Sequence, residues 1–339
     1  MIKKERVIDS LNHKESDFIP YHADFTEMEF ERIVKHTGDE FFMDKTGVHL
    51  HYTQYWGWPT EISGRSEVFL DDFGVIWNRT GPDKDIGVFE NRLFDKPDIG
   101  LWREPKFDVT RLRAEFQEVI DTGEDRFTFP GIGFSLFERA WSMCGMANLL
   151  EYMVEEPEFV NDLLNKICEF NLKIIDIANE YPFDGFYIGD DWGQQKGLIM
   201  GPVFWRKYIK SHMEKMFEGA RKKGKFVILH SCGDNYELFA DLIEIGLDCY
   251  QTFQPEIYDI EKVKREYGKD LSFWGGISTQ QLLPKASPEK VKSETARIMK
   301  IMGKGGGFLA APTHAVPPDV PPENILAMFD VFQNREKYL

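Results

Sequence analysis

Residues 225–234 read KFVILHSCGD and hold the pattern from which the fold can be inferred. Residues 226–229 are a short continuous apolar run, which predicts a strand buried on both faces. His230 and Cys232 follow at once, and Gly233 lets the chain turn. Because alternate residues of a strand point to the same side, His230 and Cys232 are expected to project together.

Similar apolar segments recur along the chain and alternate with segments of helical periodicity. Strands are expected at residues 17–24, 46–52, 127–131, 185–189, 226–230, 248–253, 271–275 and 307–311. Helices are expected at residues 3–12, 27–35, 105–122, 157–180, 202–222, 236–245, 260–267, 288–302 and 322–332, with further helix between 131 and 155. Strands that alternate with helices imply parallel crossovers, and eight such units predict an α/β fold, a (β/α)8 TIM barrel. A doubly wound open sheet is the alternative, although no GxGxxG follows the first strand.

Residues 53–106 differ in character from the rest of the chain. They are rich in Gly and Pro, and residues 68–78 are typical of a hairpin. We therefore expect an insertion after the second strand, at about 53–106. No linker divides the chain, so a single domain over residues 1–339 is predicted.

Composition excludes several classes of protein. The net charge of −16 argues against nucleic-acid binding, which needs a basic surface. No apolar run approaches the roughly 20 residues of a membrane span. The first residues lack the apolar core of a signal peptide, and the four cysteines have no framework spacing. We expect a cytoplasmic protein with reduced cysteines.

Polar residues gather at the predicted strand ends, where barrel enzymes place their chemistry. In chain order, these residues are His22, Asp24, His49, His51, Glu138, Asp190, Asp191, His230, Cys232, Gln251, Gln254, Ser278 and His314. His51 is also consistent with a position facing the outer helices.

An imidazole and a thiolate two residues apart suit a metal site, and zinc is the commonest cation for that pair. His230 and Cys232 need a third ligand, for which His314 on a proline-rich loop is the first choice. Asp190 or Asp191 is the alternative third ligand. Other interpretations stay open: a buried free cysteine beside a hydrogen-bonded histidine, a substrate-binding role for His314, and one aspartate that caps the next turn.

Several segments resemble the uroporphyrinogen decarboxylase superfamily, and most closely its zinc-dependent, corrinoid-linked methyltransferases. The resemblance is clearest in residues 185–209 (GFYIGDDWGQQKGLIMGPVFWRKYI), 230–232 (HSC), 273–283 (FWGGISTQQLL) and 321–325 (PPENI). It implies a (β/α)8 barrel with a His-x-Cys zinc motif after the fifth strand.

Two departures from the family pattern bear on function. Several of these methyltransferases carry a cysteine in a PGC-like turn after the last strand, where this chain has PTH and His314. Decarboxylases also place a histidine there. They hold substrate carboxylates with arginines after the first strand, but here that segment reads PYHADF, without arginine.

The resemblance implies methyl transfer between a small methylated donor and the cobalt of a separate corrinoid protein. Zinc on His230, Cys232 and His314 is then expected to activate the leaving oxygen. Asp190, Asp191 or His22 is expected to supply a proton. The reverse direction, from methyl-cobalt to a thiol, fits equally well.

Aromatic residues suggest a methoxylated aromatic donor, since flat rings pack on flat rings. The expected substrate-contacting residues are Trp56, Trp58, Phe134, Trp192 and Asp24. The aromatic residues also fit a simple plug of the barrel mouth. Two rival functions remain: a metal-free decarboxylase in which Asp24 or Asp190 protonates a carbanion, and a non-catalytic component that docks the corrinoid protein. The oligomeric state is open between a monomer and a homodimer.

Overall fold

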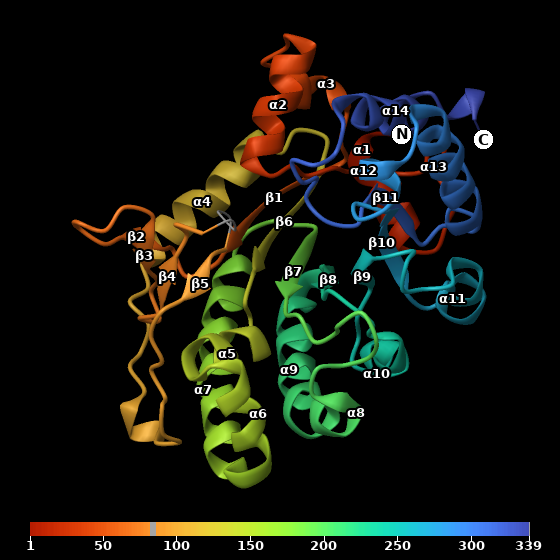
Figure 1. Ribbon diagram of the computed structural model, residues 1–339. Coiled ribbons are helices and arrows are strands. Elements are labelled where there is room, and N and C mark those ends of the chain that lie inside the picture. Colours follow the sequence, from red (N-terminus) through yellow and green to blue (C-terminus); the bar gives the residue numbers. More distant parts are fainter. Residues whose placement is uncertain (82–85, 339) are drawn as a thin grey trace.

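A curled parallel sheet forms the centre of the computed structural model, which describes residues 1–81 and 86–338 (Figure 1). Its seven strands follow the order β1-β6-β7-β8-β9-β10-β11. Their bounds are β1 Leu50–Tyr55, β6 Phe127–Ile132, β7 Gly185–Gly189, β8 Phe226–His230, β9 Cys249–Phe253, β10 Ser272–Ile277 and β11 Phe308–Pro312. Each neighbouring pair is parallel, as the alternation of strands and helices predicts.

The predicted first strand, residues 17–24, is the one that the structure does not show as a strand. It forms only isolated bridges, from Tyr21 to Ala310 and from Phe25 to Val316. Pro20 lacks a backbone donor, which weakens pairing there. Residues 20–22 nevertheless hydrogen-bond to Ala310 of β11 on one side and, through the Tyr21 carbonyl, to His49 on the other.

The predicted second strand is displaced toward the carboxyl end of the chain. β1 begins at Leu50 and runs to Tyr55, whereas residues 46–52 were expected. His49 therefore lies before the strand, 2% exposed and packed beside Phe18 and Tyr21. His51 faces outward, where its Nε2 lies 2.9 Å from Thr122 Oγ1. Neither histidine reaches the carboxyl ends of the strands.

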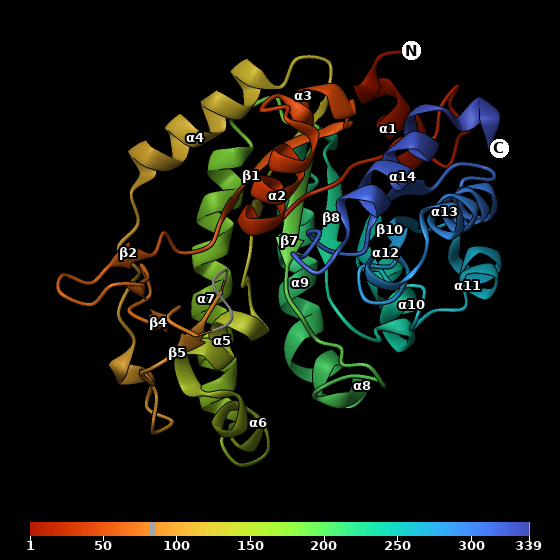
Figure 2. The same cartoon turned by 45° about the horizontal axis from the view of Figure 1, so that its top comes forward.

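Helices cover the outer face of the sheet (Figures 1 and 2). The N-terminal helices are α1 Lys3–Leu11, α2 Glu27–Thr37, α3 Phe42–Thr46 and α4 Val109–Thr122. The middle of the chain gives α5 Phe137–Cys144, α6 Met146–Glu155, α7 Pro157–Ala178, α8 Gly201–Phe204 and α9 Lys210–Ala220. The last helices are α10 Phe239–Glu244, α11 Ile260–Tyr267, α12 Leu282–Lys285, α13 Pro288–Met302 and α14 Pro322–Gln333. Within the described residues, none of the helices combines the length and apolar character that a bilayer crossing requires.

The hydrophobic core consists of two clusters of buried residues. The larger lies mainly between the strands and the surrounding helices, where α7 alone buries eleven residues. The smaller includes Phe129, Tyr187 and Trp274, whose rings pack against one another from β6, β7 and β10. Apolar side chains on both faces explain why these strands read as continuous hydrophobic runs.

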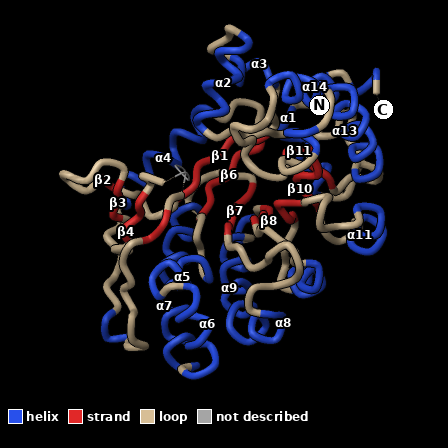
Figure 3. The backbone as a smooth tube through the Cα atoms, in the orientation of Figure 1, coloured by secondary structure: helices blue, strands red, loops and turns tan. Residues whose placement is uncertain are grey.

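A separate antiparallel sheet occupies part of the segment predicted as an insertion (Figure 3). Its strands are β2 Thr60–Glu61, β3 Val68–Leu70, β4 Ile76–Asn78 and β5 Val88–Phe89, and β3 pairs with β4 as the predicted hairpin. A buried ion pair, Arg139 Nη1 to Asp71 Oδ2 at 2.6 Å, ties this segment to α5. Asp71 also accepts hydrogen bonds from the backbone of Phe73 and Val75.

Candidate metal centre

His230 and Cys232 lie together at the carboxyl end of β8. His230 is the last residue of the strand, and its Nε2 lies 3.5 Å from Cys232 Sγ. Both side chains are only partly buried, and that of His230 is 16% exposed. The strand therefore presents the imidazole and the thiol on one side, as the two-residue spacing predicts.

His314 reaches the same point from the far end of the chain. It follows β11 by two residues, and its side chain is exposed. Two strands, β9 and β10, separate β8 from β11 in the sheet, yet one ligand atom from each of His230, Cys232 and His314 lies within 4.8 Å of the others. The imidazole rings of His230 and His314 meet edge to face at 5.7 Å. The curl of the sheet brings the three residues together.

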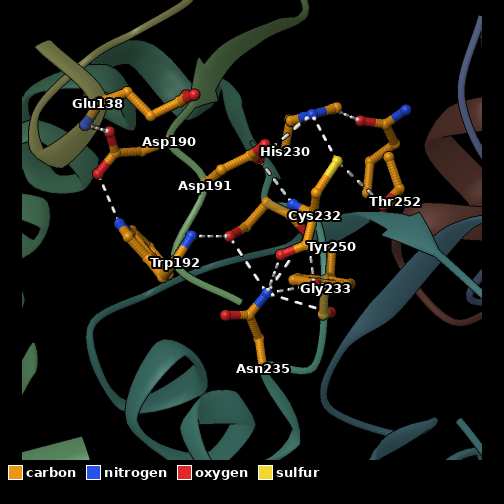
Figure 4. A network of polar contacts seen from close by, with 12 residues as sticks. Glu138, Asp190, Asp191, Trp192, His230, Cys232, Gly233, Asn235, Tyr250 and Thr252 are labelled. Carbon is orange, nitrogen blue, oxygen red and sulfur yellow. Dashed lines mark hydrogen bonds and ion pairs between the residues drawn. The ribbon is translucent and has the colours of Figure 1, made fainter. Parts of the chain in front are cut away.

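A buried amide holds the turn that carries Cys232 (Figure 4). Asn235 is 0% exposed, and its Nδ2 donates to the Cys232 carbonyl at 3.0 Å and to Tyr250 Oη at 2.9 Å. Tyr250 in turn donates to the Ser231 carbonyl at 2.6 Å. Tyr258 Oη donates to the Gly233 carbonyl at 2.7 Å. These bonds fix the backbone on both sides of the thiol.

Asp191 lies directly beside the histidine and the cysteine. Its Oδ1 accepts the Cys232 backbone N–H at 2.7 Å and lies 3.5 Å from His230 Nε2. Burial raises the pKa of the Cys232 thiol well above its ordinary value, and the negative charges of Asp191 and Glu138 add to that rise. Burial, followed by the charges of Asp191 and Asp190, also raises the pKa of Glu138 well above its ordinary value.

Asp190 faces the opposite way from Asp191 and is 0% exposed. Its carboxylate accepts the backbone N–H groups of Leu136, Phe137 and Glu138 at 2.9–3.0 Å, at the start of α5. Burial raises its pKa, and these donated bonds oppose the rise. Asp190 therefore caps the start of α5, which lies earlier in the chain, whereas the capping role that the sequence leaves open concerns the turn that follows the aspartates.

Trp192 is part of this buried network. It is 0% exposed, donates from Nε1 to Asp190 Oδ2 at 2.5 Å, and packs on Trp205 at 5.2 Å (Figure 4). In this arrangement its ring offers no surface to a ligand. The structure thus places Trp192 outside the set of accessible aromatic rings.

His22 and Asp24 form a pair on the segment before α2. His22 Nε2 lies 3.0 Å from Asp24 Oδ1, and the Asp24 side chain is 40% exposed while that of His22 is 6% exposed. Burial acts to raise the pKa of Asp24, but the charge and hydrogen bond of His22, a hydrogen bond from Tyr52 and the charge of His314 outweigh it, so that the pKa is lowered. Asp24 is therefore an ionised acceptor close to His314.

The three other predicted aromatic contacts have different exposures. Trp56 is 45% exposed, whereas Phe134 is 7% and Trp58 is 9% exposed. Trp56 and Phe134 pack together at 5.8 Å, and Trp58 packs on Tyr55 and Phe107. Trp56 is thus the most accessible of the rings that the sequence predicts.

The donor set fits a zinc-type cation. Zinc–nitrogen bonds of about 2.0–2.1 Å and zinc–sulfur bonds of about 2.3 Å at a tetrahedral angle place the two ligand atoms about 3.5 Å apart. His230 Nε2 and Cys232 Sγ are separated by 3.5 Å. The carboxylate of Asp191 lies 3.5 Å from His230 Nε2, and the charge of His314 acts on the carboxylate of Asp24. A divalent cation bound to the three ligands would balance these negative charges.

Sequence reasoning missed the residues that hold the site in place. Asn235, Tyr250 and Tyr258 give no signal in the sequence, because their contacts with the turn after β8 depend on how the chain folds around that turn. Gln251 and Glu138 stand among the strand-end residues, but nothing in their spacing assigns them a contact. The different contacts of Asp190, at the start of α5, and of Asp191, at the backbone of Cys232, likewise depend on tertiary packing.

Comparison with known proteins places the chain in a family. Residues 80–335 match the family model described as Uroporphyrinogen decarboxylase (URO-D). The uroporphyrinogen decarboxylase of Chlorobaculum parvum is 26% identical over 219 residues, covering 62% of this chain and 60% of that protein. That of Coxiella burnetii is 22% identical over 185 residues, covering 54% of this chain and 49% of that protein. The chain thus spans between 49% and 60% of the length of these two relatives.

A solved structure shares the whole fold. A methyltransferase from Methanosarcina mazei aligns over 99% of both chains with a TM-score of 0.76, at 17% sequence identity. The α/β fold with its curled parallel sheet is therefore that of a known structure. From the family match over most of its length, the chain belongs to the uroporphyrinogen decarboxylase (URO-D) family.

Proposed function

We propose that this protein is a zinc-dependent methyltransferase that moves a methyl group between a small methylated donor and the cobalt of a corrinoid protein. The observation that carries the proposal is the convergence of His230, Cys232 and His314, whose ligand atoms lie within 4.8 Å of one another. The fold of the Methanosarcina mazei methyltransferase supports the same class of reaction.

In this proposal, His230, Cys232 and His314 hold the cation. A bound zinc ion supplies Lewis acidity to the oxygen that leaves the methyl group, or to a thiol in the reverse direction. Asp191, beside the histidine and the cysteine, keeps the backbone of Cys232 in place. Asp190 has a positioning role, because its oxygens already accept hydrogen bonds at the start of α5.

Asp24 and Trp56 are assigned to substrate binding in this proposal. The Asp24 side chain is 40% exposed and is hydrogen-bonded to His22. In this proposal, Asp24 accepts a hydrogen bond from a substrate hydroxyl, or it passes a proton to the substrate through His22. Trp56 offers the accessible ring face for a methoxylated aromatic donor. The corrinoid protein, a separate partner, must reach this site for its cobalt to meet the methyl group.

The architecture that serves this reaction is proposed to be a single (β/α)8 barrel with an insertion at about residues 53–106. Residues 20–22 bond to both β11 and the residue before β1, which supports closure of the sheet into a ring. In a closed barrel, the carboxyl ends of all strands face one opening. A cytoplasmic location and a monomer or homodimer complete the proposal.

A metal-free decarboxylase is the second candidate, because the curated relatives are uroporphyrinogen decarboxylases. Asp24 would then protonate a carbanion. The acidic surroundings oppose this role: Asp24 and Asp191 lie close to His314 and His230, and the segment from Pro20 to Phe25 has no arginine for substrate carboxylates. The methyltransferase is therefore the function that the site supports better.

Zinc content tests the proposal directly. Elemental analysis of the wild type, His230→Ala, Cys232→Ser and His314→Ala should give one zinc per wild-type chain and little zinc in each variant. Asn165→Ala, which removes only the partner of the distant His212, is the matched control and should keep its zinc. Full zinc occupancy in the His230→Ala/Cys232→Ser double variant would show that these two residues are not zinc ligands.

Activity is tested with a reduced corrinoid protein and a panel of methoxylated compounds and methylated thiols. Methyl transfer changes the absorption spectrum of the cobalt, and the zinc-free variants should not produce that change. Decarboxylation of a porphyrinogen that persists in the presence of a strong chelator would favour the second candidate instead.

A further inference from the structure

The side chain of Gln251 makes a contact that the proposed chemistry does not use. Gln251 lies on β9 and is the register partner of His230 on β8. Its Oε1 is hydrogen-bonded to His230 Nδ1, on the side of the imidazole away from Cys232. The amide is 8% exposed, so it is largely shielded from water.

A second donor shares the same amide oxygen. Tyr187 Oη donates to Gln251 Oε1 at 3.3 Å, and Tyr187 is 5% exposed. Gln54 on β1 hydrogen-bonds to Tyr187, so the chain of contacts crosses the inside of the sheet from β1 to β8. An amide oxygen with two donors has both of its lone pairs engaged, which opposes rotation of the amide.

We propose that Gln251 is a positioning residue that fixes the tautomer and the orientation of His230. Because Gln251 Oε1 can only accept, His230 must carry its proton on Nδ1. The lone pair is then on Nε2, which faces Cys232 Sγ at 3.5 Å. The inference rests on the proposed function, since it assigns to Gln251 the outer support that metal-binding histidines require.

His22 provides the contrast within the same protein. Its Nε2 meets the carboxylate of Asp24, and its Nδ1 is buried without a hydrogen-bond partner in the part of the chain that the structure describes. His22 therefore carries its proton on Nε2, and the lone pair on its Nδ1 is buried. His230 has the reverse arrangement: its Nδ1 is held and its Nε2 is directed at the thiol.

Zinc affinity tests the proposal in the full-length protein. Gln251→Met keeps the volume but removes the amide acceptor, and should weaken zinc binding by about 10–100-fold in competition with a chromophoric chelator. Gln251→Glu keeps an acceptor and should bind zinc within about threefold of the wild type. Gln254→Met removes a similarly buried amide just past the same strand and should leave zinc affinity unchanged.

The tautomer is measured on metal-free protein. Nitrogen NMR of the imidazoles, with His230 assigned from the His230→Ala spectrum, should show the proton on Nδ1 in the wild type and in Gln251→Glu. Gln251→Met should show a mixture of both tautomers. A role limited to packing would leave both the zinc affinity and the tautomer unchanged in the two variants, because both substitutions keep the volume of the side chain.

Separate outcomes decide the inference and the function on which it rests. Wild-type zinc affinity together with an unchanged tautomer in Gln251→Met overturns the role of Gln251, even if His230→Ala loses zinc. A wild-type protein that binds no zinc overturns the metal site, and the tautomer measurement then still decides whether Gln251 orients His230. A wild-type His230 with its proton on Nε2 also overturns the inference.

Discussion

Two pairs of adjacent aspartates show how neighbours decide the role of a carboxylate: Asp71–Asp72 in the small sheet and Asp190–Asp191 after β7. The first aspartate of each pair is buried, with Asp71 at 5% and Asp190 at 0% exposure. Each of these two accepts several hydrogen bonds. The second is more open: Asp72 is half-buried, and the side chain of Asp191 is 32% exposed.

The two pairs differ in what surrounds them. Asp71 has a full counter-charge in Arg139, whereas Asp190 accepts only from neutral N–H groups. Asp72 accepts a hydrogen bond from a phenol, Tyr55 Oη, at 2.9 Å, but Asp191 lies beside an imidazole and accepts from the backbone of a cysteine. A buried carboxylate that already accepts several hydrogen bonds stabilises the fold. A partly exposed carboxylate beside an imidazole and a thiol can still bind a ligand or exchange a proton.

The largest effect is expected where a buried charge loses its counter-charge. Arg139→Ala leaves the Asp71 carboxylate in a site where its side chain is only 1% exposed, and should lower the free energy of unfolding by about 3–5 kcal/mol. Denaturant titration measures this loss. Arg113→Ala, which removes an exposed ion pair with Glu180, should cost far less stability, because solvent screens exposed charges. Equal losses in the two variants would contradict the assigned role of Asp71.

A slightly smaller loss is expected at the other buried carboxylate. Asp190→Ala leaves the indole of Trp192 and three N–H groups at the start of α5 without their acceptor, which should cost about 3 kcal/mol. The same denaturant titration applies, with Asp191→Ala as the matched control. If Asp191→Ala proved the more destabilising, the division between the two aspartates would be wrong.

Asp191 should affect the metal more than the fold. Asp191→Ala removes a negative charge 3.5 Å from His230 Nε2 and the acceptor of the Cys232 backbone. We expect about tenfold weaker zinc binding, equivalent to about 1.4 kcal/mol, with a loss of unfolding free energy below about 1 kcal/mol. Chelator competition on the same preparation measures the affinity. If Asp191→Ala bound zinc as tightly as the wild type, Asp191 would have no role in metal binding.

The smallest effect depends on pH and concerns Asp72. Burial raises its pKa from 3.8 to about 6, with the hydrogen bond from Tyr55 opposing the shift and the charge of Asp71 adding to it. A raised pKa in the folded state stabilises the protein below pH 3.8, and that contribution is lost as the pH rises through about 6. Relative to Asp72→Asn, the wild type should therefore lose on the order of 1 kcal/mol between these values, since the carboxyl is partly screened by solvent. A constant difference across this range would show that Asp72 keeps its ordinary pKa.

Most of the sheet was predictable because its strands are buried on both faces. The apolar runs at 127–131, 185–189, 226–230, 248–253, 271–275 and 307–311 all agree with observed strands to within two residues. The first segment could not be predicted in the same way, since Pro20 leaves it with isolated bridges. β1 was displaced because its partly buried residues read as alternation in either of two registers.

The candidate site was predictable where it depended on strand periodicity. His230 and Cys232 follow from the two-residue repeat, and His314 from the end of the last strand. The roles of Asp190 and Trp192 did not follow, because the N-terminus of α5, which Asp190 caps, lies more than fifty residues away in sequence. The spacing of residues along the sequence shows which side chains lie at the carboxyl end of the sheet. It does not show which of these side chains already have hydrogen-bond partners.

The turns after β7 and β8 cross each other through glycines, with no side chain between their backbones. A Cβ on Gly193 would lie 2.6 Å from the backbone of Gly233, and the Gly193 N–H donates to the Cys232 carbonyl. The two turns leave no room for a side chain at either glycine, since a Cβ on Gly233 would also lie 2.2 Å from the backbone of Gly193. Any larger residue at position 193 or 233 must therefore displace the turn that carries Cys232.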